Sequence, residues 1–288
     1  MTFDLQDSRV QEYFSTARER YEIFLRRKAG VSPPYTEDPA FRDWRFCNVF
    51  REDDRVTVWI RENVRDRLQE NPHVLLAMVT CRLFNRIETM EILNNNGLFD
   101  RWDSRKARKL LHGIEPIVGA AYVIKTPDGM NKLDGVLYMV DAVKEDALHL
   151  ATHGDYAMGI ALEGIWEVLQ TYPCIGRFIA YEIVSDLRHT YIGRKATDIR
   201  TWANPGPGAC RGLSFLVNDD LESIQPAGRN VREKIVKTMM KLLDLSNNKE
   251  LWPTKWPRWE MREVEHWLCE YAKWVKVTHL GMRMKRRF

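Results

Sequence analysis

Cysteines are few in this sequence, and no two of them stand close together. The five cysteines are scattered between positions 47 and 269 of the 288 residues, and no CxxC pair occurs. Neither a disulfide framework nor a zinc site of paired cysteines is indicated, so we expect reduced, packed thiols. We likewise predict no metal-ligating residues and no cofactor, and the sequence leaves open whether a divalent metal assists.

Long apolar runs are also missing. No stretch approaches the ~20 apolar residues that span a membrane, and the first residues, MTFDLQDSRVQEYF, carry acids early and no apolar core. We therefore expect a cytoplasmic protein with no membrane partner.

The short motifs of several large enzyme classes are absent. The sequence contains no GxxxxGK(S/T), GxGxxG, HExxH or GxSxG. Kinase, dinucleotide-binding, zinc-protease and hydrolase interpretations therefore lose their main support. What is present is 44% hydrophobic and 29% charged, with a net charge of +4, which is typical of a globular chain.

Large apolar residues recur at helical intervals over most of the chain, and strict alternation is scarce. We predict a mainly α protein with a single domain over residues 1–288, in which two lobes are an open alternative. Helices are expected over residues 7–28, 51–70, 72–94, 103–111, 132–144, 155–171, 176–189, 228–247 and 260–277. Only AAYVIK, residues 120–125, resembles a strand.

The stretch TYPCIGRFIAYEIVSDL predicts two helices joined by a short turn. Its first helix, residues 155–171, ends at the break formed by Tyr172 and Pro173. Gly176 then lets the backbone approach a ligand, and the second helix, which begins near Arg177, offers unpaired N–H groups and a positive dipole. This helix-hairpin-helix geometry suits a nucleic-acid phosphate, although a plain helical turn is the alternative. Two basic residues downstream, Arg194 and Lys195, are further candidate DNA contacts.

The stretch TYIGRKATDIRTWANPGPGACRGL predicts a loop rich in glycine and proline. Asp198 lies near its start and Arg211 near its end. Gly206 and Gly208 allow close approach of the backbone to a substrate, or they belong to a plain surface turn.

The order of helix, P-x-I-G-R turn, helix and downstream aspartate resembles the helix-hairpin-helix DNA glycosylase superfamily. The resemblance implies a glycosylase-like helical domain in which Gly176 and Arg177 contact DNA phosphate and Asp198 is the catalytic aspartate. The sequence departs from that pattern at Cys174, where such hairpins have their first glycine, and no cysteine cluster for an iron–sulfur site follows.

Four blocks in order, FCNVFREDDRVTVWI, YPCIGRFIAYEIVSDL, NPGPGACRGL and EHWLCEYAKW, resemble the α-glutamyl/putrescinyl-thymine pyrophosphorylase family, the amino acid:DNA transferases of phages with hypermodified thymine. The same module resembles the helical part of phage 5-hydroxymethyluracil DNA kinases, but the missing phosphate loop disfavours a kinase. The blocks span residues 46–274.

That resemblance implies a DNA base-modifying transferase. The enzyme replaces the pyrophosphate of 5-pyrophosphomethyl-uracil in double-stranded DNA with the amine of an amino acid or polyamine, after the base has left the stack. If a phage encodes the protein, its location is the host cytoplasm. A helix-hairpin-helix glycosylase that removes a modified base and a non-catalytic DNA-binding subunit are the alternatives.

Cations are needed for the leaving pyrophosphate, and arginine presents planar donors to phosphate oxygens. Arg51 and Arg55 stand four apart on one predicted helix face, and Arg211 follows the glycine-rich loop. Asn48, one turn before Arg51, is a candidate for the uracil edge or a helix cap. An intrahelical ion-pair patch of Arg51, Asp54 and Arg55 is the alternative.

A carboxylate is needed to take a proton from the donor amine. Asp198 is the first candidate, followed by Asp186, Glu182 and Glu270. Lys273 stands one turn after Glu270 and is a candidate substrate contact, with a structural ion pair between the two as the alternative.

Overall fold

The computed structural model describes residues 3–153 and 161–283. Within these ranges every regular element is a helix, so the mainly α prediction is confirmed, and AAYVIK lies in a loop rather than a strand. In chain order the elements are α1 (Ser8–Lys28), α2 (Pro39–Asp43), η1 (Arg51–Asp53), α3 (Arg55–Ile60), η2 (Arg61–Arg65), α4 (Asp66–Leu68), α5 (Val74–Phe84), α6 (Ile87–Asn95), α7 (Ser104–Leu111), α8 (Lys132–His153), α9 (Leu162–Leu169), α10 (Arg177–Leu187), α11 (Pro207–Asn218), α12 (Arg229–Leu245) and α13 (Met261–Thr278). No described helix is long and apolar enough to cross a membrane.

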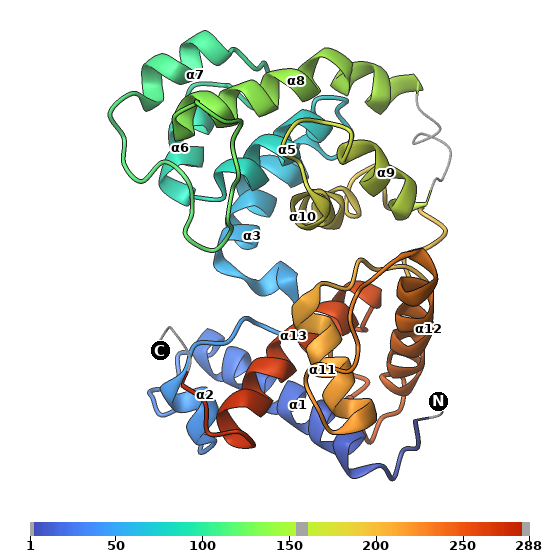
Figure 1. The fold of residues 1–288 in the computed structure, drawn as a ribbon. Coiled ribbons are helices and arrows are strands. Elements are labelled where there is room, and N and C mark those ends of the chain that lie inside the picture. Colours follow the sequence, from blue (N-terminus) through green and yellow to red (C-terminus); the bar gives the residue numbers. More distant parts are fainter. Residues whose placement is uncertain (1–2, 154–160, 284–288) are drawn as a thin grey trace. The chain divides into compact units, whose positions relative to one another are not determined.

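The chain divides into two compact units (Figure 1). Unit 1 comprises Met1–Asp54 and Arg200–Phe288, and unit 2 comprises Arg55–Ile199. Unit 1 is therefore discontinuous in sequence and contains α1, α2, η1 and α11 to α13, whereas unit 2 is one continuous segment that contains α3 to α10.

Aromatic side chains from both ends of the chain form the core of unit 1. Tyr13 of α1 contacts Trp259 and Tyr271, with ring centroids 6.0 and 5.4 Å apart, and Phe14 lies 5.5 Å from Trp259. The buried indole of Trp267 donates to the Tyr13 carbonyl at 3.1 Å, so its polar atom is paired as burial requires. This core joins the first helix of the chain to the last.

Two glycines allow α11 and α13 to pack at very close range. A Cβ on Gly212 would stand 2.1 Å from the Leu268 carbonyl oxygen, and one on Gly208 would stand 2.4 Å from the Cys269 sulfur. The predicted loop is therefore wrong from Pro207 onward, where α11 begins with a proline that is preorganised for the first helical turn. Gly208 serves packing between helices, because it faces α13.

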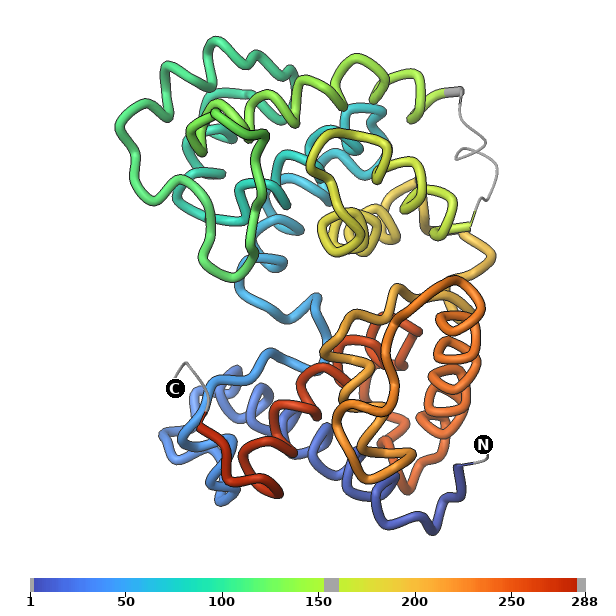
Figure 2. The backbone as a smooth tube through the Cα atoms, viewed as in Figure 1, coloured from blue at the N-terminus to red at the C-terminus, as the bar shows by residue number. Residues whose placement is uncertain are grey.

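In unit 2, α5 is buried at every position from Val74 to Phe84, and both α8 and α10 pack against it (Figure 1). A helix that is buried on every side belongs in a core, and its one charged residue, Arg82, is paired there with Asp186. Figure 2 traces the long connection at residues 112–131, between α7 and α8. The buried side chains of Ile117 and Ile124 anchor this connection to the unit.

Several predicted helix boundaries differ from the observed ones. The helix expected over 51–70 is interrupted at Asp54, which has an extended backbone where the chain leaves unit 1. Arg51 and Arg55 therefore lie on different elements rather than on one helix face. The helix expected over 72–94 is divided at Asn85, whose left-handed φ of 44° ends α5.

The first predicted helix of the hairpin appears as α9, which ends at Leu169, while α10 matches the second closely. Residues 154–160, where the first helix was expected to begin, lie outside the described residues. The helix expected over 132–144 continues to His153 as α8, because no breaking residue occurs in between.

Candidate functional site: a buried charge cluster in unit 1

Charged side chains from three separate parts of the sequence meet inside unit 1. The α1 helix contributes one arginine, the segment that ends at η1 contributes three residues, and α13 contributes an ion pair. We call this group the charge cluster; its members are Arg20, Asn48, Arg51, Asp54, Glu270 and Lys273. Four of the six were predicted as site residues from two sequence blocks more than 200 positions apart.

Asn48 connects the parts of the charge cluster. Its backbone N–H donates to the Asp54 carboxylate at 3.1 Å, and its side-chain amide donates to the Asp53 carbonyl at 2.7 Å. Arg20 in turn donates to the Asn48 side-chain oxygen at 2.6 Å. Asn48 therefore caps no helix, and it fixes the segment that carries Arg51 and Asp54.

Glu270 is 2% exposed and is the buried acid that α13 contributes to the charge cluster. It accepts from the Cys47 backbone N–H at 2.9 Å and forms an ion pair with Lys273. Burial by itself raises the pKa of Glu270, but Lys273 and His266 outweigh burial and hold this pKa below its ordinary value. Burial by itself lowers the pKa of Lys273, but the Glu270 carboxylate outweighs burial and raises this pKa above its ordinary value.

The carboxyl group of Asp54 has a raised pKa. Burial raises the pKa of its carboxyl group to about 6, although the Asn48 N–H and Arg51 both act in the opposite direction. A carboxyl group with such a pKa readily exchanges its proton under physiological conditions. Perturbed acids of this kind are concentrated in functional sites, which distinguishes Asp54 from an ordinary surface acid.

Arg20 has a buried donor without a partner. Its side chain is 6% exposed, and its Nη1 atom makes no hydrogen bond within the described part of the chain. Burial is the main reason that the pKa of Arg20 is lowered. A buried, unpaired cationic donor costs free energy, so its retention favours a functional role over a packing role.

Cys47 and His266 flank the charge cluster. One donor atom each from Cys47, Asp54 and His266 lies within 4.8 Å of the others, which makes this the candidate metal-holding group among the described residues. The Glu270 carboxylate, more than burial, raises the pKa of the Cys47 thiol well above its ordinary value.

Sequence reasoning missed Arg20, Cys47 and His266, and it assigned Asp54 only to an ion-pair patch. A local signal existed for His266, because positions 266, 270 and 273 follow the i, i+4, i+7 spacing of one helix face. No local signal marks Arg20, which reaches Asn48 only because α1 packs against this segment.

The other predicted acids lie in unit 2. Asp198 is half-buried and accepts from the first backbone N–H groups of α9, those of Leu162 at 2.6 Å and Glu163 at 3.0 Å. It therefore caps a helix across a gap of more than thirty residues. Glu182 is buried and accepts from the Tyr122 hydroxyl at 2.5 Å.

Asp186, also in unit 2, is completely buried and pairs with Arg82, whose Nη2 atom lies 2.7 Å from its carboxylate. Arg82 also donates to Thr57 at 3.1 Å and to Asn85 at 3.3 Å. The network holds α3, α5 and α10 together. This environment is that of a structural ion pair.

The turn between α9 and α10 contains Cys174 in the left-handed region, with φ at 57°. Glycine has no steric penalty there, so the cysteine occupies a glycine-like position. Gly176 begins α10 with an ordinary φ of −82° and nothing within 4 Å of an added Cβ, so the fold itself does not require glycine there. The Arg177 guanidinium lies over the Trp166 ring, 5.4 Å from its centroid.

The remaining predicted cations lie at the surface of their own units. In unit 2, Arg55 at the start of α3 and Lys195 are exposed, and Arg194 pairs with Glu70 at 3.0 Å. In unit 1, Arg211 pairs with the exposed Glu222 at 3.2 Å. None of these four belongs to the charge cluster. The N–H of Gly206 lies 3.5 Å from the Glu265 carboxylate at the start of α11.

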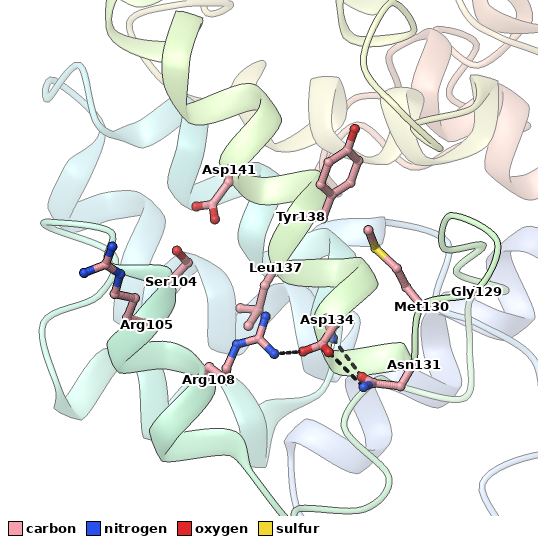
Figure 3. A pocket seen from close by; sticks show the side chains of 10 residues that line it. All are labelled: Ser104, Arg105, Arg108, Gly129, Met130, Asn131, Asp134, Leu137, Tyr138 and Asp141. Atoms are coloured by element: carbon pink, nitrogen blue, oxygen red, sulfur yellow. Dashed lines mark hydrogen bonds and ion pairs between the residues drawn. The ribbon is translucent and has the colours of Figure 1, made fainter.

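Unit 2 also contains a surface pocket of about 430 Å³ between α7 and α8 (Figure 3). Figure 3 shows Arg108 directed at Asp134, which also accepts from the Asn131 amide at 2.9 Å. Half-exposed Met130 and Tyr138 form its apolar rim. None of the predicted site residues lines this pocket.

Comparison with known proteins gives two matches. The sequence model described as "5-hmdU DNA kinase, helical domain" matches residues 7–284. A 5-hmdU DNA kinase of Bacillus phage SP10 is 26% identical over 294 residues, which cover 91% of this chain and 44% of that protein. The chain thus spans less than half the length of this curated relative. No solved structure matches.

Proposed function

The chain belongs to the family of 5-hmdU DNA kinase helical domains, a family of phage thymine hypermodification, and on this premise we propose that it is a DNA base-modifying transferase. It replaces the pyrophosphate of 5-pyrophosphomethyl-uracil in double-stranded DNA with the amine of an amino acid or polyamine. Its fold is a helix-hairpin-helix, glycosylase-like domain. The flipped base enters a pocket where the donor amine attacks the exocyclic carbon and pyrophosphate leaves.

One observation carries this proposal: the two distant sequence blocks that resemble the transferases meet in the charge cluster. The first block contributes Asn48, Arg51 and Asp54, and the second contributes Glu270 and Lys273. A purely structural role does not favour this arrangement, because burying several charges costs more free energy than packing apolar side chains. A site that handles pyrophosphate, in contrast, requires concentrated cations.

Within the charge cluster, Arg20, Arg51 and Lys273 bind the leaving pyrophosphate. Glu270 keeps Lys273 charged and oriented through their ion pair. The unpaired Nη1 atom of Arg20 gains a phosphate oxygen as its acceptor. Asn48, Arg55 and Arg211 remain further candidates for contacts to the substrate.

Asp198 remains the proposed base for the donor amine, with Glu182 and Glu270 as alternatives, because the buried ion pair of Asp186 with Arg82 gives that acid a structural role. The half-buried Asp198 carboxylate caps α9, so Asp198→Asn tests catalysis with limited damage to the fold, because the amide oxygen still accepts one N–H. We expect Asp198→Asn to abolish transfer while its melting temperature stays within a few degrees of wild type. Retained transfer would remove Asp198 from the mechanism.

In unit 2, the turn around Gly176 grips the DNA backbone, with Arg177, Arg194 and Lys195 as further proposed contacts. In unit 1, Gly206 is a separate candidate, whereas Gly208 is a packing residue. The open space beside Gly176 supports this role, since the fold itself does not require glycine there. We expect Arg177→Ala to weaken DNA binding and to reduce its salt dependence by about one released counterion. Arg188→Ala, at the other end of α10, is the matched control and should bind as wild type does.

The test of the reaction is direct. Purified protein is incubated with DNA that carries 5-pyrophosphomethyl-uracil, together with one amino acid or polyamine of a panel at a time. The nucleosides are then separated and identified by mass spectrometry. We expect one new nucleoside with a matching amine. Lys273→Met should lower the rate at least tenfold, while Lys276→Met, on the same helix but outside the charge cluster, should not. No product with any donor would refute the transferase.

A second function is favoured by the similarity to the phage SP10 protein, a 5-hmdU DNA kinase. In that case the chain is the helical part of a kinase that acts at 5-hydroxymethyluracil, and it binds such DNA without transferring an amine. The chain then binds 5-hydroxymethyluracil DNA in preference to unmodified DNA of the same sequence and gives no new nucleoside in the transfer assay, which distinguishes the two functions.

The two alternatives from the sequence predict other outcomes. A glycosylase leaves an abasic site, so alkali nicks the DNA after incubation. A non-catalytic DNA-binding subunit gives no product, and Asp198→Asn then leaves its phenotype intact while Arg177→Ala weakens DNA binding.

A further inference from the structure

We propose that Cys47, Asp54 and His266 form a binding site for a single thiophilic divalent cation, with Zn²⁺ as the expected ion. One sulfur, one carboxylate oxygen and one imidazole nitrogen lie within 4.8 Å of one another in unit 1. Zinc–ligand bonds of about 2.0–2.3 Å require these donors to close by roughly an ångström, which rotation of the side chains supplies.

The surrounding contacts hold the three donor residues in place. The Asn48 N–H donates to the Asp54 carboxylate at 3.1 Å, and the Asn48 carbonyl contacts His266 Nε2 at 3.1 Å. The Glu270 carboxylate accepts the Cys47 N–H at 2.9 Å. Outer contacts of this kind orient metal ligands and are a regular feature of built metal sites. On metal binding the ion replaces the Asn48 contact of Nε2, and the Cys47 thiol releases its proton to solvent.

The donor set selects the type of ion. Sulfur and imidazole favour zinc over magnesium or calcium, which prefer oxygen ligands. Three protein ligands leave a fourth tetrahedral position open, as in catalytic rather than structural zinc sites. The absence of CxxC pairs from the sequence excludes only paired-cysteine zinc sites, because here the ligands come from a loop, a helix end and a distant helix.

The neighbouring cations indicate what occupies the open position. Arg20 and Arg51 lie beside Asp54, and a bound divalent ion adds to their positive charge. Such a site attracts an anionic oxygen ligand, and a diphosphate oxygen fits it best. This last step rests on the proposed function, whereas the metal site itself does not.

Metal binding is tested on the full chain without DNA or amine. The protein is dialysed with one equivalent of Zn²⁺, and bound zinc is measured by elemental analysis. Co²⁺ is then substituted, and the absorption spectrum is recorded. We expect one ion per chain and a thiolate-to-cobalt charge-transfer band. Cys47→Ser should remove the band, and His266→Ala should weaken Zn²⁺ binding at least about tenfold.

The controls are Cys174→Ser, an exposed thiol in unit 2, and His279→Ala, which lies just beyond α13 and contacts Glu12. Both should bind the ion as wild type does. If Cys47→Ser fails to fold, the cobalt spectrum of the wild-type chain decides alone. A wild-type spectrum without a thiolate band, or Zn²⁺ affinity equal in wild type and His266→Ala, would overturn the site. Failure of amine transfer leaves this result unaffected.

Discussion

Glu263 is a buried acid in the first turn of α13, where it forms a capping box with Glu260 and accepts the Glu260 N–H at 2.9 Å. Burial raises the pKa of its carboxyl group from 4.5 to about 7. The folded protein therefore binds this proton more tightly than the unfolded chain does. Ionisation of Glu263 therefore lowers the free energy of unfolding. This loss is absent below pH 4.5, grows as the pH rises, and is complete above pH 7.

We expect Glu263→Gln to remove this pH dependence, because glutamine keeps an acceptor for the Glu260 N–H but carries no charge. Relative to wild type, the free energy of unfolding of the variant should rise between pH 5 and pH 8 by up to roughly 3 kcal/mol. Chemical denaturation at several pH values measures this difference. A difference that does not change with pH would contradict the raised pKa.

The Arg82–Asp186 pair shows how a predicted functional acid can serve the fold. Asp186→Ala leaves the buried Arg82 guanidinium without its carboxylate and should lower the free energy of unfolding by about 3–5 kcal/mol. The double variant Arg82→Met, Asp186→Leu should recover much of this loss, since apolar side chains of similar size replace a buried ion pair well. Urea unfolding of the wild type, the single variant and the double variant measures these free energies. An Asp186→Ala protein as stable as wild type would refute the structural role of Asp186.

Among the elements, α11 depends most strongly on close packing. Gly212→Ala places a Cβ 2.1 Å from the Leu268 carbonyl oxygen, so α11 and α13 must move apart. We expect a loss of at least about 2 kcal/mol in the free energy of unfolding, as for other overpacked cores. Thermal unfolding followed by circular dichroism measures the loss.

Gly176→Ala is the control for this substitution, because nothing lies within 4 Å of the added Cβ. As the N-cap residue of α10 it should cost less than about 1 kcal/mol. Equal losses for the two variants would show that the α11–α13 contact is looser than 2.1 Å implies.

The elements also show what local sequence patterns can and cannot predict. The α1 and α7 helices are found where periodicity placed them, and each begins at an aspartate whose side chain caps it, Asp7 and Asp103. The α11 helix was missed because Gly206, Pro207 and Gly208 are typical of a loop. Packing against α13 stabilises this helix despite its weak helix propensity. This packing cannot be inferred from residues that are neighbours in the sequence.

At the scale of the whole molecule, unit 2 is continuous and unit 1 is not. We expect a fragment of residues 55–199 to fold alone, because its buried helix α5 and the Arg82–Asp186 network lie entirely within it. The fragment should unfold cooperatively and retain a helical circular-dichroism spectrum. A fragment of residues 200–288 alone should not, because it lacks α1, whose Tyr13 and Phe14 complete the aromatic core. A 55–199 fragment without cooperative unfolding would contradict this division.

Local sequence patterns are enough to predict the helical class, most helix positions and four members of the charge cluster, and the blocks that resemble thymine-modifying enzymes can be recognised in order. These features depend on residues close together in the chain, where periodicity, caps and motifs act. Three findings required the folded chain: Arg20, Asp54 and His266 join this group, Arg51 and Arg55 belong to different units, and Gly212 is a packing residue. The physical reason is separation: the bond from Cys47 to Glu270 spans 223 positions, and it forms only because the aromatic core brings the two ends of the chain together.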